Sequence, residues 1–237
     1  MRFLDLTLGT PEENLALDEA LLLSAEGEGG EILRIWEWPR PAVVLGSGGK
    51  IADDVDVLSC QRDQVPILRR ASGGGTVLLG TGCLLYSLVL SIERSAEMSD
   101  IRRSYAYILS RVNHALQPEA SAAEICGTSD LAIGGRKFSG NAQQRKQRHI
   151  LHHGTLLFAF DASIVSNYLL PPPRQPEYRG GRTHTDFLMN LSLSKDTIIA
   201  RLREEWGAAV CTRYNLHADV ARLAVEKYSL RAWIERR

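Results

Sequence analysis

Arg69-Arg70-Ala71-Ser72-Gly73-Gly74-Gly75-Thr76 is the most distinctive stretch of the chain, because three successive glycines follow two arginines. Glycine backbones can approach a ligand closely and adopt conformations that other residues avoid. Their N–H groups can surround an anion, and arginines at the edge can add hydrogen bonds to a phosphate. Taken alone, the stretch is equally consistent with a glycine-rich turn between strands, and its glycine spacing matches neither a P-loop nor a dinucleotide-binding fingerprint.

The overall charge of the chain is balanced. Its 237 residues carry 28 basic and 28 acidic side chains, for a formal net charge of +0. This balance argues against a general attraction to nucleic acid or to an anionic membrane, and the sequence holds no apolar run long enough to span a bilayer. We therefore expect neither nucleic acid nor membrane as a partner.

The cysteines and the N-terminus indicate the compartment. Cys60, Cys83, Cys126 and Cys211 show no C-x-x-C spacing, which argues against a structural zinc site. Free thiols are typical of a reducing compartment, and the first residues lack a signal-peptide pattern. We expect a cytoplasmic protein that forms a single domain over residues 1–237.

The order of the apolar segments predicts the fold class. Thr10-Pro11-Glu12-Glu13 carries the cap, proline and glutamate of a helix start, and this helix ends within 26–30. Further helices are expected at about 53–62, 103–116, 164–169, 195–208 and 219–237. Strands are expected at 3–8, 32–38, 42–45, 65–68, 131–133, 137–142 and 151–160, with apolar segments at 76–79 and 84–92. Hairpin-like strands with flanking helices predict an α+β fold with a mainly antiparallel sheet, not a doubly wound fold.

Two further motifs carry chemistry. Residues 134–143, Gly-Gly-Arg-Lys-Phe-Ser-Gly-Asn-Ala-Gln, place Lys137 after a turn and before small residues. A lysine cation can bridge a phosphate and a carbonyl oxygen, although an exposed hairpin lysine is the commoner case. His152 and His153 are adjacent, so on a strand they point to opposite faces and do not bind one metal together. One of them can face a pocket while the other packs in the core.

In this order, the motifs resemble the catalytic domain of the lipoate–protein ligase A family, within the wider group of biotin and lipoate ligases and octanoyltransferases. The resemblance runs from about Phe3 to Trp206. The stretches that carry it are 69–77, Thr128-Ser129-Asp130-Leu131, 135–143, His152-His153-Gly154-Thr155-Leu156-Leu157, 178–184 and 187–191. Each stretch alone is weak, but the ordered set is specific.

The resemblance implies an activity and a set of site residues. The expected enzyme activates lipoate or octanoate with ATP to an acyl-adenylate, then transfers the acyl group to a carrier lysine. Expected carriers are acyltransferase subunits of 2-oxoacid dehydrogenases and the glycine-cleavage H protein. Lys137 is expected to bind the bridging phosphate and acyl oxygens, and Arg70 the phosphate and carboxylate oxygens. The nucleotide is expected against Gly74, Gly75, Thr76, Val77 and Leu78, and the acyl chain against Trp36, Ser72 and His153.

A metal ion and an additional domain are further expectations. Mg²⁺ is expected with the triphosphate, with Asp130 as the candidate carboxylate and a structural aspartate at a strand edge as the alternative. Residues 79–83 depart from the His-Asp…Gly-Asn pattern of many ligases, and residues 47–50 lack the usual arginine. The accessory C-terminal domain of larger ligases is expected to be absent from this chain, with a separate accessory chain as an expected partner.

An octanoyltransferase of the same fold is the main alternative. Such an enzyme takes octanoyl from acyl carrier protein through a cysteine thioester, without ATP, and Cys126 is the candidate nucleophile. A nucleophilic cysteine needs a neighbouring positive charge, which His153 or Lys137 could supply. The ligase-like residues 128–131 after Cys126 favour a chemically idle thiol instead. A non-catalytic protein that only holds an acyl-adenylate or a carrier is a third, less favoured, class.

Overall fold

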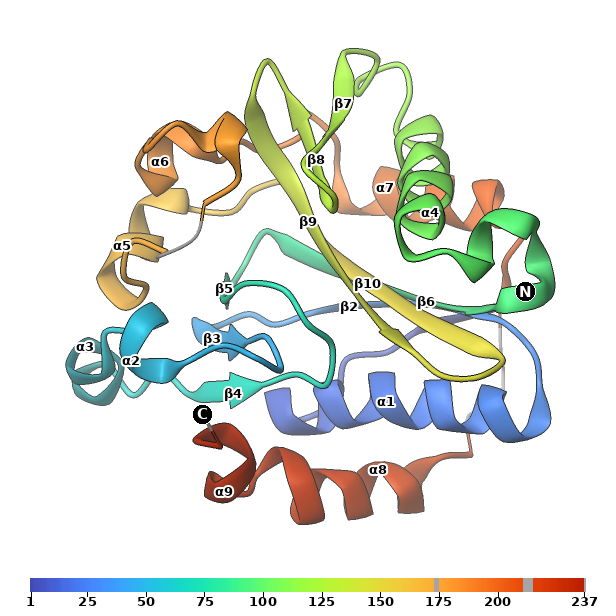
Figure 1. Ribbon diagram of the computed structural model, residues 1–237, viewed down its shortest axis with the longest axis horizontal. Helices are drawn as coiled ribbons and strands as arrows, with labels where there is room; N and C mark the ends of the chain where they lie inside the picture. The colour runs from blue at the N-terminus through green and yellow to red at the C-terminus, as the bar shows by residue number, and fades with distance from the viewer. Residues whose placement is uncertain (173–174, 211–214, 237) are drawn as a thin grey trace.

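The main sheet has eight strands in the order β11-β1-β2-β6-β10-β9-β8-β7 (Figure 1). The computed structural model describes residues 1–172, 175–210 and 215–236. Most neighbouring strands are antiparallel, but β1 runs parallel to both β2 and β11. The strands are β1 (Arg2–Asp5), β2 (Ile32–Glu37), β6 (Cys83–Ser91), β7 (Ala123–Cys126), β8 (Asp130–Ile133), β9 (Arg136–Arg145), β10 (His149–Leu157) and β11 (Ala209–Val210).

A second, smaller sheet has the order β4-β3-β5 and holds the glycine-rich stretch between two of its strands. Its strands are β3 (Ala42–Leu45), β4 (Ile67–Arg69) and β5 (Val77–Leu79). β3 is parallel to β4 and antiparallel to β5. The glycine loop (residues 70–76) therefore leaves the end of β4 and returns along the opposite side of β3.

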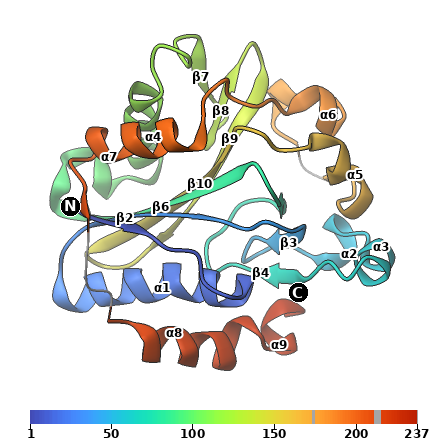
Figure 2. The same cartoon turned by 180° about the vertical axis from the view of Figure 1, so that it is seen from behind.

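Helices lie on both faces of the main sheet (Figures 1 and 2). α1 packs against one face and carries α8 on its outer side, and α4 with α7 covers the other face. The helices are α1 (Pro11–Glu28), α2 (Ile51–Asp54), α3 (Val57–Arg62), α4 (Ile101–Ala115), α5 (Val165–Tyr168), α6 (His184–Phe187), α7 (Lys195–Glu205), α8 (His217–Leu223) and α9 (Arg231–Ile234). We call the two sides of the sheet the α1 face and the α4 face.

Strand alternation divides the core into two apolar clusters. On β10, Leu151 belongs to the cluster on the α1 face, whereas Ile150 and Leu156 belong to the cluster on the α4 face. Successive side chains of a strand point to opposite faces, so one strand contributes to both clusters. The predicted α+β fold with a mainly antiparallel sheet flanked by helices is confirmed.

The start of α1 follows the predicted capping chemistry. Thr10 Oγ1 accepts a hydrogen bond from the Glu13 N–H, and the Glu13 carboxylate accepts one from the Thr10 N–H. This reciprocal pair satisfies two backbone donors that have no partner within the helix, and Pro11 follows at the first helical position. The predicted start is confirmed.

Other boundaries differ from the sequence predictions. The helix expected at 53–62 is two helices, because Val55 is extended and pairs with Leu169, and Asp56 then caps α3. The tail expected at 219–237 comprises α8, a π-helical turn at Ala224–Tyr228 and α9. β1 is shorter than the strand expected at 3–8, and β7 and β11 were not predicted from the sequence. Cys211, Arg237 and part of the proline run at 171–173 lie outside the described residues.

Within the described ranges, no helix is both long enough and apolar enough to cross a membrane.

Candidate active site

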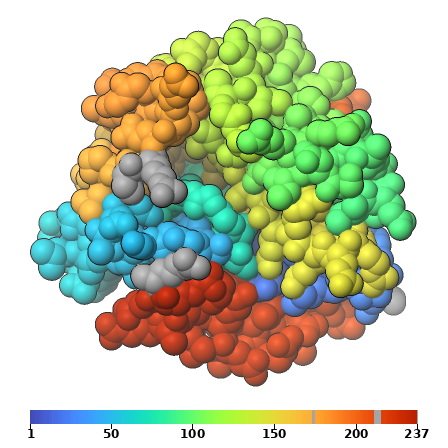
Figure 3. All heavy atoms as spheres, viewed as in Figure 1, coloured from blue at the N-terminus to red at the C-terminus, as the bar shows by residue number. Residues whose placement is uncertain are grey.

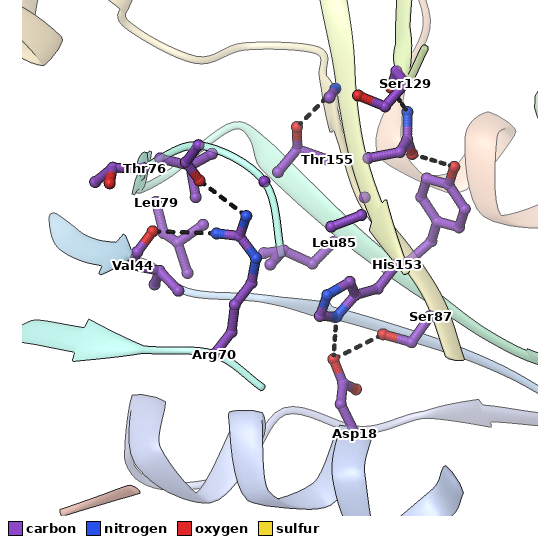
Figure 4. A pocket seen from close by; sticks show the side chains of 18 of the residues that line it. Asp18, Val44, Arg70, Thr76, Leu79, Leu85, Ser87, Ser129, His153 and Thr155 are labelled. Atoms are coloured by element: carbon purple, nitrogen blue, oxygen red, sulfur yellow. Dashed lines mark hydrogen bonds and ion pairs between the residues drawn. The ribbon is translucent and has the colours of Figure 1, made fainter. Parts of the chain in front are cut away.

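A cavity of about 150 Å³ lies between the glycine loop, α1 and strands β6, β9 and β10 (Figure 4). Its lining combines apolar side chains such as Leu15, Trp36 and Val44 with charged ones. Nine residues predicted from the sequence line it, namely Trp36, Arg70, Gly74, Gly75, Thr76, Val77, Asp130, Lys137 and His153. Ser72, Leu78 and Cys126 are absent from the lining.

A second cavity, of about 120 Å³, adjoins the first. Five residues line both cavities: Thr76, Val77, Lys137, Gly140 and Thr155. Thr76, Val77 and Leu78 line the second cavity, and the rest of its lining is largely apolar, including Phe138, Leu157, Phe160, Phe187 and Leu188. In Figure 3 the surface is hollowed between the orange α6 region and the teal residues of the small sheet. Lys137 therefore stands where two adjoining cavities meet.

The Arg70 guanidinium holds the glycine loop in place through hydrogen bonds to loop atoms. Its Nη2 donates to the carbonyl oxygens of Gly73 (2.6 Å) and Gly75 (2.8 Å), and its Nε donates to Ser72 Oγ (3.0 Å). Its Nη1 donates to the Val44 carbonyl, which ties the loop to β3. Burial lowers the pKa of Arg70 to about 10. The guanidinium thus fixes the loop while it lines the first cavity.

At two positions of this region, a neighbouring atom lies so close that only glycine, which has no Cβ, fits. Gly74 has φ 87°, in the region that favours glycine, and a Cβ on it would lie 2.9 Å from Arg70 Nη2. A Cβ on Gly46, just after β3, would lie only 2.0 Å from the Gly74 carbonyl oxygen. Gly75 differs, because a Cβ there would meet no atom of the described residues within 4 Å.

His153 belongs to a buried chain of polar groups on the α1 face. Its Nε2 lies 2.6 Å from Ser72 Oγ, and its Nδ1 lies 3.2 Å from Asp18 Oδ2. Asp18 also accepts from Ser87 Oγ at 2.8 Å and pairs with Arg34 at 2.6 Å. Figure 4 shows His153 and Ser87 both pointing toward Asp18. The chain of contacts links the cavity, through Ser72, to the glycine loop.

Asp18 is a site residue that the sequence analysis missed. Burial alone raises the pKa of its carboxyl, but the Arg34 guanidinium and His153 outweigh burial and hold the pKa below its usual value. The carboxylate is therefore charged and fully paired within the α1 face. The signal in the sequence is weak: an acidic residue stands among leucines on a helix that is buried along most of its length.

Lys137 is paired in the resting structure. Its Nζ lies 2.9 Å from Asp130 Oδ1, and the Tyr178 hydroxyl donates to Asp130 Oδ2 at 2.8 Å. Burial, and then the Asp130 carboxylate, raises the pKa of Tyr178. Asp130 therefore serves as the anionic partner of Lys137. Among the described residues, no group of three His, Cys, Asp or Glu side chains is arranged to hold a metal ion.

Cys126 lies outside both cavities, on β7 opposite Asp130. Burial, with Glu124 and Asp130 nearby, raises the pKa of its thiol. This shift is opposite to the one that a nucleophilic cysteine needs. Cys60 and Cys83 are also free thiols, and burial raises their pKa values to about 11 and about 12.

His152 points away from the cavity, as the alternation predicts. It is fully buried on the α4 face, where it meets Tyr86, Tyr105 and the amide of Gln143. Burial, with a smaller contribution from the charge of His153, lowers its pKa to about 3. The expectation that the two histidines face opposite sides is confirmed.

The comparisons with known proteins agree on one family. Residues 10–205 match the family model described as the lipoyl protein ligase A/B catalytic domain. The octanoyltransferase LipM of Carboxydothermus hydrogenoformans is 32% identical over 185 residues, which cover 71% of this chain and 68% of that protein. The lipoate-protein ligase LplJ of Bacillus subtilis is 28% identical over 193 residues, which cover 81% of this chain and 56% of that protein.

Solved structures share the fold. A bi-partite lipoate protein ligase from Thermoplasma acidophilum, studied with its E2 lipoyl domain, superposes with a TM-score of 0.83 at 23% identity, covering 99% of this chain and 96% of that one. A lipoate-protein ligase A bound with ATP superposes with a TM-score of 0.75 at 24% identity, covering 99% and 98%. At this level of identity the likeness establishes the fold.

Proposed function

The chain belongs to the lipoyl protein ligase A/B catalytic domain family, and from this premise we propose that it is a lipoate–protein ligase. Relatives in the family include lipoate-protein ligases and octanoyltransferases, so the chain is an enzyme of the lipoylation kind. The proposed reaction activates lipoate or octanoate with ATP to an acyl-adenylate. The acyl group then passes to the lysine amine of a carrier domain.

One observation carries the choice of ligase over transferase: Lys137 stands between two cavities that together suit the two halves of an acyl-adenylate. The first cavity, with Trp36 and Leu15, suits an apolar acyl chain. The second, which residues 76–78 and several apolar side chains line, suits a nucleotide base. A structure of lipoate-protein ligase A with bound ATP, and one of the Thermoplasma acidophilum protein with bound lipoic acid, support the use of both substrates.

In the first proposed step, a carboxylate oxygen of lipoate attacks the α-phosphorus of ATP. The new O–P bond forms as the bond to the bridging oxygen breaks, and pyrophosphate leaves with that electron pair. Lys137 exchanges Asp130 for the substrate oxygens, where its cation stabilises the developing negative charge. The glycine loop, held by Arg70, offers a fixed backbone surface to the phosphate.

In the second proposed step, the carrier lysine attacks the acyl carbonyl of the mixed anhydride. The amide bond forms, AMP leaves, and the ammonium proton passes to solvent. No nucleophile from this chain takes part, because the adenylate is already activated. The Thermoplasma acidophilum ligase was studied with its E2 lipoyl domain, which supports lipoyl domains as carriers here. The glycine-cleavage H protein is proposed as a second carrier. That ligase is bi-partite, so a separate accessory chain is proposed as a further partner.

Mg²⁺ fits the site only when substrate phosphates supply most of its ligands. Mg²⁺ is bound through one or two carboxylates together with substrate phosphates, and the described residues offer Asp130 without a wider acidic cluster. When bound, the ion would neutralise triphosphate charge. Asp130 would hold it after release of Lys137, and Tyr178 would keep the carboxylate oriented.

The octanoyltransferase alternative rests on the similarity to the Carboxydothermus hydrogenoformans enzyme. A thioester mechanism there would need a thiolate facing the acyl cavity. Cys126 lines neither cavity, and acidic neighbours raise its pKa. The geometry therefore supports the ligase more than the transferase.

ATP–pyrophosphate exchange tests the proposal. With lipoate present, wild-type protein is expected to exchange label between pyrophosphate and ATP, and to bind a non-hydrolysable lipoyl-adenylate analogue in calorimetry. If the protein neither exchanges nor binds the analogue, but transfers octanoyl from acyl carrier protein, the ligase assignment is wrong.

A further inference from the structure

The two arginines that begin the glycine motif serve different parts of the molecule. Arg70 faces the loop, whereas the fully buried Arg69 reaches the C-terminal helix α9. Arg69 Nε and Nη2 donate to the Ile234 carbonyl at 2.9 and 2.7 Å. In return, the Trp233 indole N–H donates to the Arg69 carbonyl at 2.8 Å. A residue at the start of the glycine motif is thus tied in both directions to a segment about 165 positions later in the sequence.

Arg69 also holds the turn that follows β3. Its Nη1 donates to the carbonyl oxygens of Gly46 (2.9 Å) and Gly49 (2.8 Å). From the other side, the Arg236 guanidinium donates to the Ser47 carbonyl at 2.6 Å. The turn 46–49 is therefore fixed by one arginine from β4 and one from the C-terminal end of the described chain.

This turn supports the glycine loop directly. The Ser47 N–H donates to the Ser72 carbonyl at 2.8 Å. The Gly46 backbone lies so close to Gly74 that a Cβ there would sit 2.0 Å from the Gly74 carbonyl oxygen. Closely packed backbones transmit displacement. A shift of the turn would therefore shift the loop that lines the first cavity.

The segment that carries α9 is itself well anchored. Trp233 is flanked by the Arg236 guanidinium at 3.9 Å and the Lys227 ammonium at 4.3 Å from its ring centre. Lys227 Nζ and the Tyr228 hydroxyl bind the Glu19 carboxylate of α1 at 2.7 and 2.8 Å. Figures 1 and 2 show α8 and α9 lying along α1 and ending beside β4. The segment thus connects α1 to the turn 46–49.

We propose that the C-terminal segment, residues 217–236, positions the glycine loop for nucleotide binding, with Arg69 and Trp233 as the positioning residues. The segment lies beyond the residues 10–205 that match the family model, so the family assignment does not include it. The expected effect on ATP binding rests on the proposed function. The expected effect on the mobility of the glycine loop rests on the contacts alone.

Hydrogen–deuterium exchange and steady-state kinetics of two variants test the proposal. Trp233→Ala removes both the indole donor and the ring against which the Lys227 and Arg236 cations lie, and Trp233→Phe keeps an aromatic ring but removes the donor. Arg231→Ala is the matched control on the same helix, because that side chain is 87% exposed. In Trp233→Ala we expect amide exchange at 46–49 and 72–76 to rise about tenfold. KM for ATP should rise by a similar factor, and KM for lipoate should change less.

Trp233→Phe should give a smaller change in the same amides, and Arg231→Ala should match the wild type. Unchanged exchange at 72–76 in a folded Trp233→Phe and Trp233→Ala would overturn the proposal, as would an equal rise at every amide of the chain. If the loop amides respond but the wild type shows no ATP-dependent activity, the proposed function fails and the positioning role stands. If Trp233→Ala does not fold, amide exchange at 72–76 in Trp233→Phe tests the proposal instead.

Discussion

Two identical neighbours on β10 show how differently the two faces of the sheet are used. His153, on the α1 face, meets Asp18 and Ser72 and lines the first cavity. His152, on the α4 face, is enclosed by Tyr86 and Tyr105, and its pKa falls to about 3 through burial. Residue type therefore does not decide the role of a histidine here; its role depends on the helix that covers it and on its hydrogen-bond partners.

The α1 face holds the buried Arg34 guanidinium, which is paired and hydrogen-bonded. Arg34 is fully buried, yet it binds Asp18, Asn14 and the Leu6 carbonyl. A buried polar group is costly unless it is hydrogen-bonded, so this network must remain complete. The α4 face is mostly apolar packing from α4 and α7. We therefore expect changes to the Asp18 network on the α1 face to alter the site, and changes at α4-face residues that line neither cavity, such as His152, to alter stability.

The largest effect is expected from Asp18→Ala. The change leaves Arg34 buried without its carboxylate, and breaking such a pair costs about 3–5 kcal/mol of unfolding free energy. Urea denaturation measures this loss. Glu28→Ala, an exposed acid of the same helix, should change stability by less than about 0.5 kcal/mol. A loss below about 1 kcal/mol for Asp18→Ala would show that the α1-face network is dispensable.

Lys137→Ala should separate catalysis from folding. The side chain is 23% exposed and touches both cavities, and the Tyr178 hydroxyl still donates to Asp130 without it, so its loss should lower the melting temperature only slightly. Loss of a positioned charge typically reduces the rate about 10²–10³-fold, or about 2.7–4 kcal/mol. Adenylate formation in quenched flow checks this, with exposed Lys146→Ala as the control. Wild-type turnover in a folded Lys137→Ala variant would contradict the site assignment.

Gly75→Val and Gly74→Val form a matched pair within one loop. A valine at Gly75 enters the cavity without meeting the protein, so it should weaken binding of an adenylate analogue by about 1–3 kcal/mol and leave the melting temperature unchanged. A valine at Gly74 meets Arg70 and an unfavourable φ, so it should lower stability as well. Equal losses of stability in both variants would mean that the loop is only a structural turn.

On the α4 face, the titration of His152 should make the unfolding free energy depend on pH. Its pKa of about 3 in the folded chain lies below the ordinary value near 6.5, so between these values the unfolded chain alone binds the proton. Unfolding free energy should therefore fall, as pH drops from about 6 to 4, by about 1.4 kcal/mol per pH unit from this group. Denaturation of wild type and His152→Gln across this range isolates the contribution. Parallel pH profiles would refute it.

The smallest effect is expected from Cys126→Ser. The thiol lines neither cavity, so lipoate- and ATP-dependent transfer should be retained, and stability should change by less than about 0.5 kcal/mol. Mass spectrometry during turnover should find no acyl group on this residue. Loss of activity together with an acyl-enzyme thioester at Cys126 would establish the transferase mechanism instead.

Local sequence signals predicted much of the fold and part of the site. The capping residues Thr10 and Glu13 fix the start of α1, and strand alternation places His152 and His153 on opposite faces. The triple glycine and the turn before Lys137 predicted cavity-lining segments, because turn chemistry depends on residues close together in the chain. These features need no knowledge of distant partners.

Which side chains the site residues contact was decided by the tertiary structure alone. Asp18 meets His153 across 135 positions, and Arg69 meets Ile234 across 165, so no local pattern could reveal either contact. Lys137 and Asp130 were both predicted, but their pairing, and the raised pKa of Cys126, depend on which groups the folded sheet brings together. Burial and long-range electrostatics act through space, so the chemistry of these side chains was determined only when the chain folded.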